Sequence, residues 1–128
     1  MKKTAIFVSF FEPFSVDKQI EICTKFSNEH NFHTTICYSF NDLLNDKYDN
    51  IVMLSYLCLG DKAVNIHEKL DLLKNKIPNV YLYSIFEESC HDSISNIYGD
   101  SPENLIYMQI VFAIKTKNDF IKWTNFLK

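Results

Sequence analysis

Apolar residues gather in five short runs along the chain, and these runs predict β-strands. They cover residues 4–10, 32–38, 50–59, 80–86 and 105–114. The first and third runs are mainly apolar, which is typical of strands buried on both faces of a sheet. In the second run apolar and polar residues alternate, and this pattern predicts a strand at a sheet edge.

In the segments between these runs, apolar residues recur at helical spacing. Helices are expected over residues 15–29, from about 61 to before Pro78, and from 118 onward, with a short helical turn after Asp42. Ser15 is a plausible N-cap of the first helix, because its hydroxyl can accept a backbone N–H of the first turn. Residues 87–104 are polar and contain Gly99 and Pro102, which predicts a loop with at most a short helix.

Alternating strands and helices predict an α/β fold. Parallel strands need crossover helices, so we expect one domain over residues 1–128, a three-layer sandwich with helices on both faces of a five-stranded parallel sheet. The expected strand order is 2-1-3-4-5. In such sheets ligands bind beyond the carboxyl ends of the strands, near the first and third strands. The loops 9–15, 55–61 and 84–91 are therefore the candidate site.

Composition narrows the possible functions. The chain has 128 residues, of which 47% are hydrophobic and 23% charged, as in globular proteins. Its 13 basic residues are all lysines, and 16 acidic residues give a net charge of -3. The absence of arginine excludes an arginine finger, a bidentate guanidinium clamp on phosphate and a C-x5-R phosphatase loop. The acidic balance, without a dense lysine run, predicts that nucleic acid is not a partner.

Cysteine and histidine spacing predicts neither a metal site nor a disulfide framework. The four cysteines are Cys23, Cys37, Cys58 and Cys90, without a C-x-x-C pair, and the four histidines form no spaced ligand set with them. We expect a reduced cytoplasmic protein. No apolar run reaches the length of a membrane span, so no membrane association is expected.

One segment resembles the flavodoxin family. Residues 48–56 (YDNIVMLSY), followed by Gly60-Asp61, are similar to the family's third strand and the aromatic loop after it. The short chain and residues 116–120 (TKNDF) are also similar to the small flavodoxin-like activator of class Ib ribonucleotide reductase. The resemblance implies a flavodoxin-like fold, an FMN cofactor and electron transfer to or from a partner enzyme, with no catalytic residue of the chain's own.

The same resemblance implies a set of cofactor-binding residues. Tyr56 and His91 would bracket the flavin ring, and Ser9 and Ser15 would donate to its phosphate. The full set is Ser9, Phe10, Phe11, Phe14, Ser15, Ser55, Tyr56, Leu57, Cys58, Gly60, Ser89 and His91.

The loop after the first strand departs from the flavodoxin pattern and supports a second hypothesis. Pro13 removes one N–H, Glu12 brings a negative charge towards a phosphate, and no glycine is present between residues 9 and 15. The alternative is a cofactor-free binding or regulatory module of the same fold. Its phenylalanine-rich loop, with Phe10, Phe11 and Phe14, would then contact a protein partner.

Other chemistries fit the sequence less well. A phosphoacceptor receiver needs carboxylates where Ser9 and Ser55 stand. A nucleotide-hydrolysing TIR-type domain would use Glu68, which lies on a helix patterned for solvent. Cys90 and His91 are adjacent in the chain, and adjacent residues rarely meet in attack geometry.

Overall fold

The structure is a computed structural model that describes residues 3–9, 15–60 and 62–89. In this part of the chain four strands form one parallel sheet of order β2-β1-β3-β4. The strands are β1 (Thr4–Phe7), β2 (Thr34–Cys37), β3 (Asn50–Met53) and β4 (Tyr81–Ser84). The helices are α1 (Val16–Glu29), α2 (Phe40–Asn45), α3 (Ala63–Lys76) and α4 (Ile85–Ser89), with a 3-10 turn η1 (Tyr56–Cys58).

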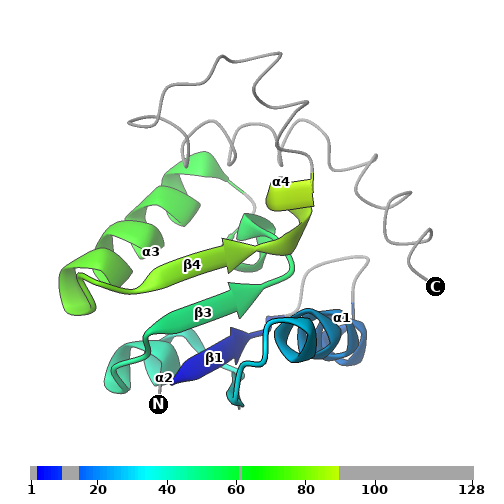
Figure 1. Ribbon diagram of the computed structural model, residues 1–128. Helices are drawn as coiled ribbons and strands as arrows, with labels where there is room; N and C mark the ends of the chain where they lie inside the picture. Colours follow the sequence, from blue (N-terminus) through cyan, green and yellow to red (C-terminus); the bar gives the residue numbers. More distant parts are fainter. Residues whose placement is uncertain (1–2, 10–14, 61, 90–128) are drawn as a thin grey trace.

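Helices cover both faces of the sheet, as predicted (Figure 1). On one face the Phe26 ring of α1 lies 5.6 Å from the Tyr83 ring, and Tyr83 is in register with Val52 of β3. On the other face Phe7 meets Phe40 of α2, with ring centroids 6.3 Å apart. Successive strand residues point to opposite faces, so these two contacts define the two helical layers.

Burial follows the sequence pattern. Every residue of β1 and β3 is buried, as expected for central strands, whereas β2 exposes Thr34 and Thr35 and lies at the sheet edge. Ile6 and Ile51 are fully buried at the centre of the core. Burying a side chain of this size contributes about 1.5–3 kcal/mol, so the two central strands are a main source of stability.

The strand ends differ from the sequence prediction. The run 50–59 was expected to be one strand, but β3 ends at Met53, because the Ser55 hydroxyl accepts the Leu57 N–H at 3.1 Å and starts the turn η1. The run 80–86 likewise ends as a strand at Ser84, and α4 follows directly, where a loop was predicted from residue 87.

Several predicted features lie outside the described residues. These are the fifth strand at 105–114, the last helix from 118 and the loop around Cys90 and His91. The described sheet therefore shows four strands where five were predicted, and the single domain over residues 1–128 stays a prediction.

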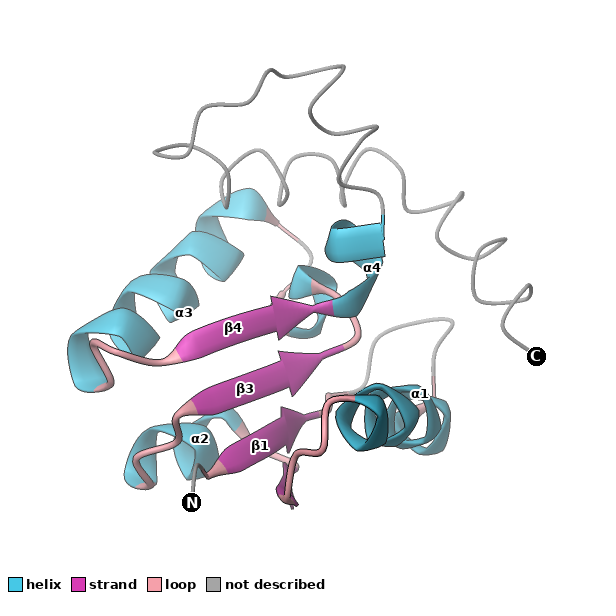
Figure 2. Ribbon diagram, in the orientation of Figure 1, coloured by secondary structure: helices cyan, strands magenta, loops and turns pink. Residues whose placement is uncertain are grey.

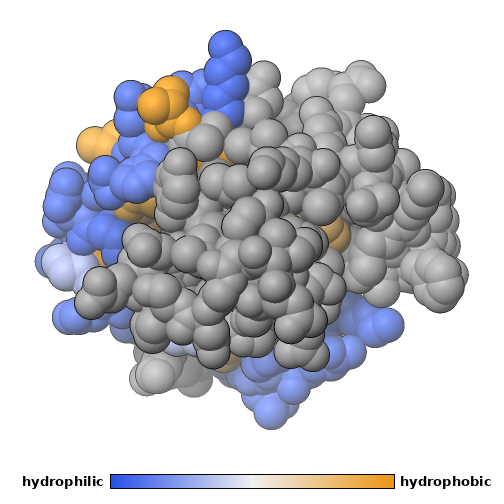
Figure 3. Space-filling model, turned by 90° about the horizontal axis from the view of Figure 1, so that it is seen from above, coloured by the Kyte–Doolittle hydropathy of each residue, from blue (hydrophilic) through white to orange (hydrophobic). Residues whose placement is uncertain are grey.

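The described surface is mainly polar in the view from above (Figure 3). Its exposed large hydrophobic side chains are Tyr38, Val64, Leu72 and Tyr81. Among the described helices, none has both the length and the apolar character that crossing a bilayer requires.

Candidate functional site

The carboxyl ends of the parallel strands meet at one edge of the sheet, which we call the carboxyl edge (Figure 2). Ser9 lies just beyond β1, Ser55 just beyond β3, and Glu87 lies in α4, directly beyond β4. Parallel sheets bind their ligands at this edge, so these side chains form the candidate site.

The first group at this edge is the Ser9 cluster, which consists of Ser9, Gln19 and Cys58. The buried Gln19 of α1 holds the Ser9 backbone from both sides: its Nε2 donates to the Ser9 carbonyl at 2.6 Å, and its Oε1 accepts the Ser9 N–H at 3.3 Å. The same Oε1 accepts the Cys58 thiol at 3.4 Å, and the partly exposed Ser9 donates its hydroxyl to the Cys58 carbonyl. Gln19 thus fixes the end of β1 against α1 and η1.

The Ser9 cluster is electrically neutral at physiological pH. Burial raises the pKa of the Cys58 thiol to about 12. Burial, with a smaller contribution from Cys58, also raises the pKa of the neighbouring Cys23 thiol well above its usual range. Thiols that stay protonated are poor nucleophiles. Ser9, the partly exposed member of this cluster, is therefore its candidate nucleophile.

The second group is the Glu87 cluster, which consists of Ser55, Tyr56, Ser84 and Glu87. The Glu87 carboxyl accepts three hydrogen bonds: from the Ser55 hydroxyl at 2.8 Å, from the Tyr56 N–H at 3.2 Å and from the Ser84 hydroxyl at 2.7 Å. Glu87 itself is fully buried. One side chain therefore joins the end of β3, the turn η1 and the end of β4.

Burial has the largest effect on the pKa values of Glu87 and Tyr56 in this cluster. It raises the pKa of Glu87 from 4.5 to about 7, although hydrogen bonds from Ser84 and Ser55 act in the opposite direction. Burial, and then the nearby Glu87, also raises the pKa of the Tyr56 hydroxyl well above its usual range. Glu87 is therefore a group that can change charge near neutral pH.

The two clusters meet at η1. Glu87 holds the N–H at the start of this turn, and the last residue of the turn, Cys58, accepts the Ser9 hydroxyl through its carbonyl. Gly60 follows, and a Cβ there would lie 3.1 Å from the Asn65 Cβ, so glycine lets the chain pass close to α3. Hydrogen bonds thus link α4 to η1 and η1 to Ser9.

The structure brings together part of the site that the sequence predicted. Ser9 and Cys58 are in contact, Ser55 and Tyr56 share Glu87, and Leu57 lies buried between them. The Tyr56 ring, expected to stack on a ligand, is only 3% exposed. The remaining predicted residues belong to neither cluster or lie outside the described residues: Ser15 caps α1, Gly60 follows η1, Ser89 ends α4, and Phe10, Phe11, Phe14 and His91 are not described.

Gln19, Ser84 and Glu87 organise this edge, and none of them was predicted as a site residue, although Ser84 and Glu87 lie in the predicted site loop 84–91. Gln19 had a detectable signal, because it lies on the apolar stripe of α1 with Cys23, four residues further on. Glu87 directly follows an apolar run, which gave no sign that the chain would turn back into the core.

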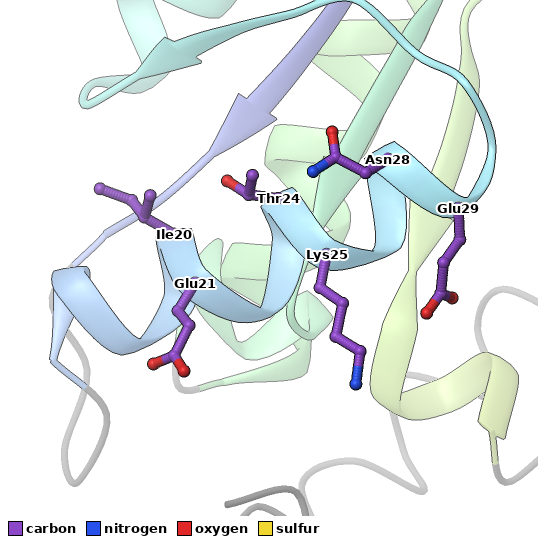
Figure 4. A pocket seen from close by; sticks show the side chains of 6 residues that line it. All are labelled: Ile20, Glu21, Thr24, Lys25, Asn28 and Glu29. Atoms are coloured by element: carbon purple, nitrogen blue, oxygen red, sulfur yellow. The ribbon is translucent and has the colours of Figure 1, made fainter.

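A shallow pocket lies along α1, lined among the described residues by Ile20, Glu21, Thr24, Lys25, Asn28 and Glu29 (Figure 4). None of these residues belongs to the Ser9 or Glu87 cluster. Within the described part of the chain, no three His, Cys, Asp or Glu side chains are grouped so that they could hold a metal ion.

Comparison of the whole fold with known proteins identifies its class. No family model and no curated protein matches the sequence. The N-terminal catalytic domain of TP901-1 integrase has a similar structure, with a TM-score of 0.54 and 19% sequence identity over 94% of this chain and 98% of that domain. This chain has the fold of an integrase catalytic domain. The C-terminal catalytic domain of ISC1926 TnpA, an IS607-like serine recombinase, is also similar, with a TM-score of 0.49 and 11% identity over 88% and 97% of the two chains.

The integrase-type fold corrects the interpretation of the sequence. The flavodoxin resemblance, including its ribonucleotide reductase activator branch, is wrong, and so is the electron-transfer function that it implied. The flavodoxin-like module with a protein-binding phenylalanine loop is not supported either. The resemblance rested on two short segments, residues 48–56 and 116–120, and on an order of strands and helices that unrelated folds share. FMN binding stays a prediction.

The expectation that nucleic acid is not a partner is also contradicted, by the structural similarity to the catalytic domain of TP901-1 integrase. That exclusion rested on the net charge of the whole chain. A net charge is an average, and it does not describe the charges at one edge of a sheet.

Proposed function

We propose that this protein takes part in DNA recombination and contacts DNA through the carboxyl edge of its sheet. The observation that supports this function is the match to the catalytic domain of TP901-1 integrase, which extends over nearly the whole of both chains. The carboxyl edge is the face where Ser9 is partly exposed and where parallel sheets bind their ligands. We retain the cytoplasm as the proposed compartment, in keeping with the free thiols of Cys23, Cys37 and Cys58.

Lysine must supply any charged contact with the DNA backbone, because all 13 basic residues of the chain are lysines. Lysine binds phosphate as a point charge, without the two-pronged geometry of arginine. Each contact releases counterions from the DNA, so the affinity falls as the salt concentration rises.

Titration of a fluorescent DNA duplex with the purified protein tests this function. We expect saturable binding at low salt, with an affinity that falls about linearly on a double-logarithmic plot against salt concentration. A matched titration in the presence of heparin, a competing polyanion, separates binding of the duplex from simple ion exchange. If no complex forms even at low salt, the proposed function is wrong.

A second candidate function is strand cleavage by Ser9, which is favoured by the partial exposure of this residue just beyond β1. In this reaction the Ser9 oxygen forms a bond to the phosphorus of a phosphodiester, and the bond from phosphorus to one sugar oxygen breaks. The departing sugar oxygen takes up a proton, and the serine proton passes to solvent. The product is a covalent link between Ser9 and one DNA end.

Trapping of this covalent product tests Ser9. We expect that the wild-type protein, incubated with nicked duplex DNA and separated on a denaturing gel, gives a protein–DNA adduct that Ser9→Ala does not form. Ser39→Ala is the matched control, because it removes an exposed hydroxyl that caps α2 beyond β2 and should leave the adduct unchanged. If the wild type forms no adduct but still binds DNA, strand cleavage is excluded and DNA association stands.

A further inference from the structure

Glu87 is a fully buried carboxyl whose position demands an explanation. Removing a carboxylate from water is costly, and an apolar side chain of similar volume usually stabilises a core at least as well. Here the carboxyl receives hydrogen bonds from three separate places: the Ser55 hydroxyl after β3, the Tyr56 N–H in η1 and the Ser84 hydroxyl at the end of β4. Glu87 therefore contributes to the fold by joining the end of β3, the turn η1 and the end of β4.

The turn held by Glu87 also holds Ser9. Tyr56 opens η1 and Cys58 ends it, and the Cys58 carbonyl accepts the Ser9 hydroxyl. Within η1 the Cys58 N–H donates to the Ser55 carbonyl at 3.0 Å, so both ends of the turn are joined by a hydrogen bond. We therefore expect a change at its first N–H to affect the carbonyl at its end.

We propose that Glu87 is a positioning residue that fixes the turn Tyr56–Cys58 and, through it, the acceptor of the Ser9 hydroxyl. The importance of this acceptor for DNA rests on the function proposed above for Ser9. The positioning itself depends only on the contacts between α4, η1 and Ser9.

Protonation of Glu87 provides the readout for this role. Burial favours the neutral carboxyl, and its pKa lies near 7. The titratable groups that interact with it from η1 are Tyr56 and Cys58, both of which stay neutral because burial raises their pKa values. On α4 itself the neighbour is Glu88, an exposed residue whose carboxyl pKa is raised mainly by partial desolvation. Above neutral pH Glu87 in the folded protein carries a buried charge, and the cost of removing this charge from water favours opening of the contacts around η1.

Two variants separate positioning from simple packing. In Glu87→Gln the amide oxygen can still accept from Ser55 and Tyr56, and the amide nitrogen can donate to the Ser84 hydroxyl. In Glu87→Leu the volume is similar but all three hydrogen bonds are lost. The Gln variant therefore imitates the neutral acid at every pH, whereas the Leu variant removes the link.

Backbone hydrogen exchange, followed residue by residue by NMR in the full chain, tests the proposal. Loss of a hydrogen bond to a buried carboxyl should increase local opening, so the Tyr56 amide of Glu87→Leu should exchange about 10- to 100-fold faster than in the wild type. Glu87→Gln should keep the wild-type protection. The Val8 N–H, bonded to the Cys37 carbonyl at 3.1 Å, is the control amide and should not change.

The pH dependence of Tyr56 amide protection in the wild type and in Glu87→Gln gives a second comparison. After correction for base catalysis of exchange, protection of Tyr56 should fall in the wild type as the pH rises through about 7 and stay level in Glu87→Gln. Unchanged Tyr56 protection in Glu87→Leu would overturn the proposal. If no Ser9 adduct forms with DNA, strand cleavage fails on its own account, and the exchange data still decide whether Glu87 positions the turn.

Discussion

At the scale of single residues, two buried polar side chains determine how the carboxyl edge is built. Gln19 holds the Ser9 backbone, and Glu87 holds η1. The flavodoxin resemblance implied Ser9, Ser55 and Cys58 as cofactor-binding residues, in the loops expected beyond the carboxyl ends of the strands. It could not predict their partners, since a buried glutamine or glutamate is recognised only once its hydrogen-bond donors and acceptors are placed in space.

Glu87 also makes stability depend on pH. Its pKa is about 7 in the folded protein and 4.5 when exposed, so the folded state holds the proton more tightly. The stabilisation from this proton is fully present below pH 4.5 and is lost as the pH rises through about 7. The whole effect is on the order of 3 kcal/mol in the free energy of unfolding.

Urea unfolding of the wild type and Glu87→Gln between pH 4.5 and 8 measures this effect. We expect the difference in unfolding free energy between the two proteins to shift in favour of Glu87→Gln as the pH rises, because glutamine cannot become charged. A difference that stays constant over this range would show that Glu87 has an ordinary pKa.

At the scale of elements, the centres of the strands were predictable and their ends were not. The buried positions of β1 and β3 and the edge position of β2 follow from the apolar pattern alone. The pattern failed where a local hydrogen bond overrode it, as at Ser55, whose hydroxyl turns an apolar run into η1. Four of the five predicted strands are present, and the fifth lies beyond the described residues.

The N-cap of α1 is an element-scale feature that the sequence did predict. The Ser15 hydroxyl accepts the Lys18 N–H at 3.1 Å. Ser15→Ala should lower the free energy of unfolding by about 1 kcal/mol, the usual cost of losing such a cap. Ser15→Asp, which keeps an acceptor, should retain most of the stability in the same urea measurement. Equal stability of Ser15→Ala and the wild type would show that this cap contributes nothing.

At the scale of the whole molecule, the order of elements was predicted but the fold family was not. A parallel sheet of order 2-1-3-4 with helices on both faces occurs in unrelated proteins, so the apolar pattern could not separate a flavodoxin from an integrase catalytic domain. The acidic net charge likewise gave no information about the carboxyl edge. Both errors arose because averages over the chain hide how residues are arranged in space.

Two lysines at opposite ends of α3 make the central claim testable at this scale. Lys62 is exposed and immediately precedes α3, near the carboxyl edge, whereas the exposed Lys76 ends the same helix at the opposite edge. Both variants, Lys62→Gln and Lys76→Gln, change the net charge of the protein by the same amount. Any difference between them therefore reports on where DNA binds.

The most direct measurement is the affinity of the wild type and these two variants for a DNA duplex over a range of salt concentrations. If DNA contacts the carboxyl edge, Lys62→Gln weakens binding and reduces the salt slope by about one, and Lys76→Gln behaves like the wild type. Absence of binding by the wild type, or weaker binding by Lys76→Gln alone, would contradict a DNA-contacting carboxyl edge.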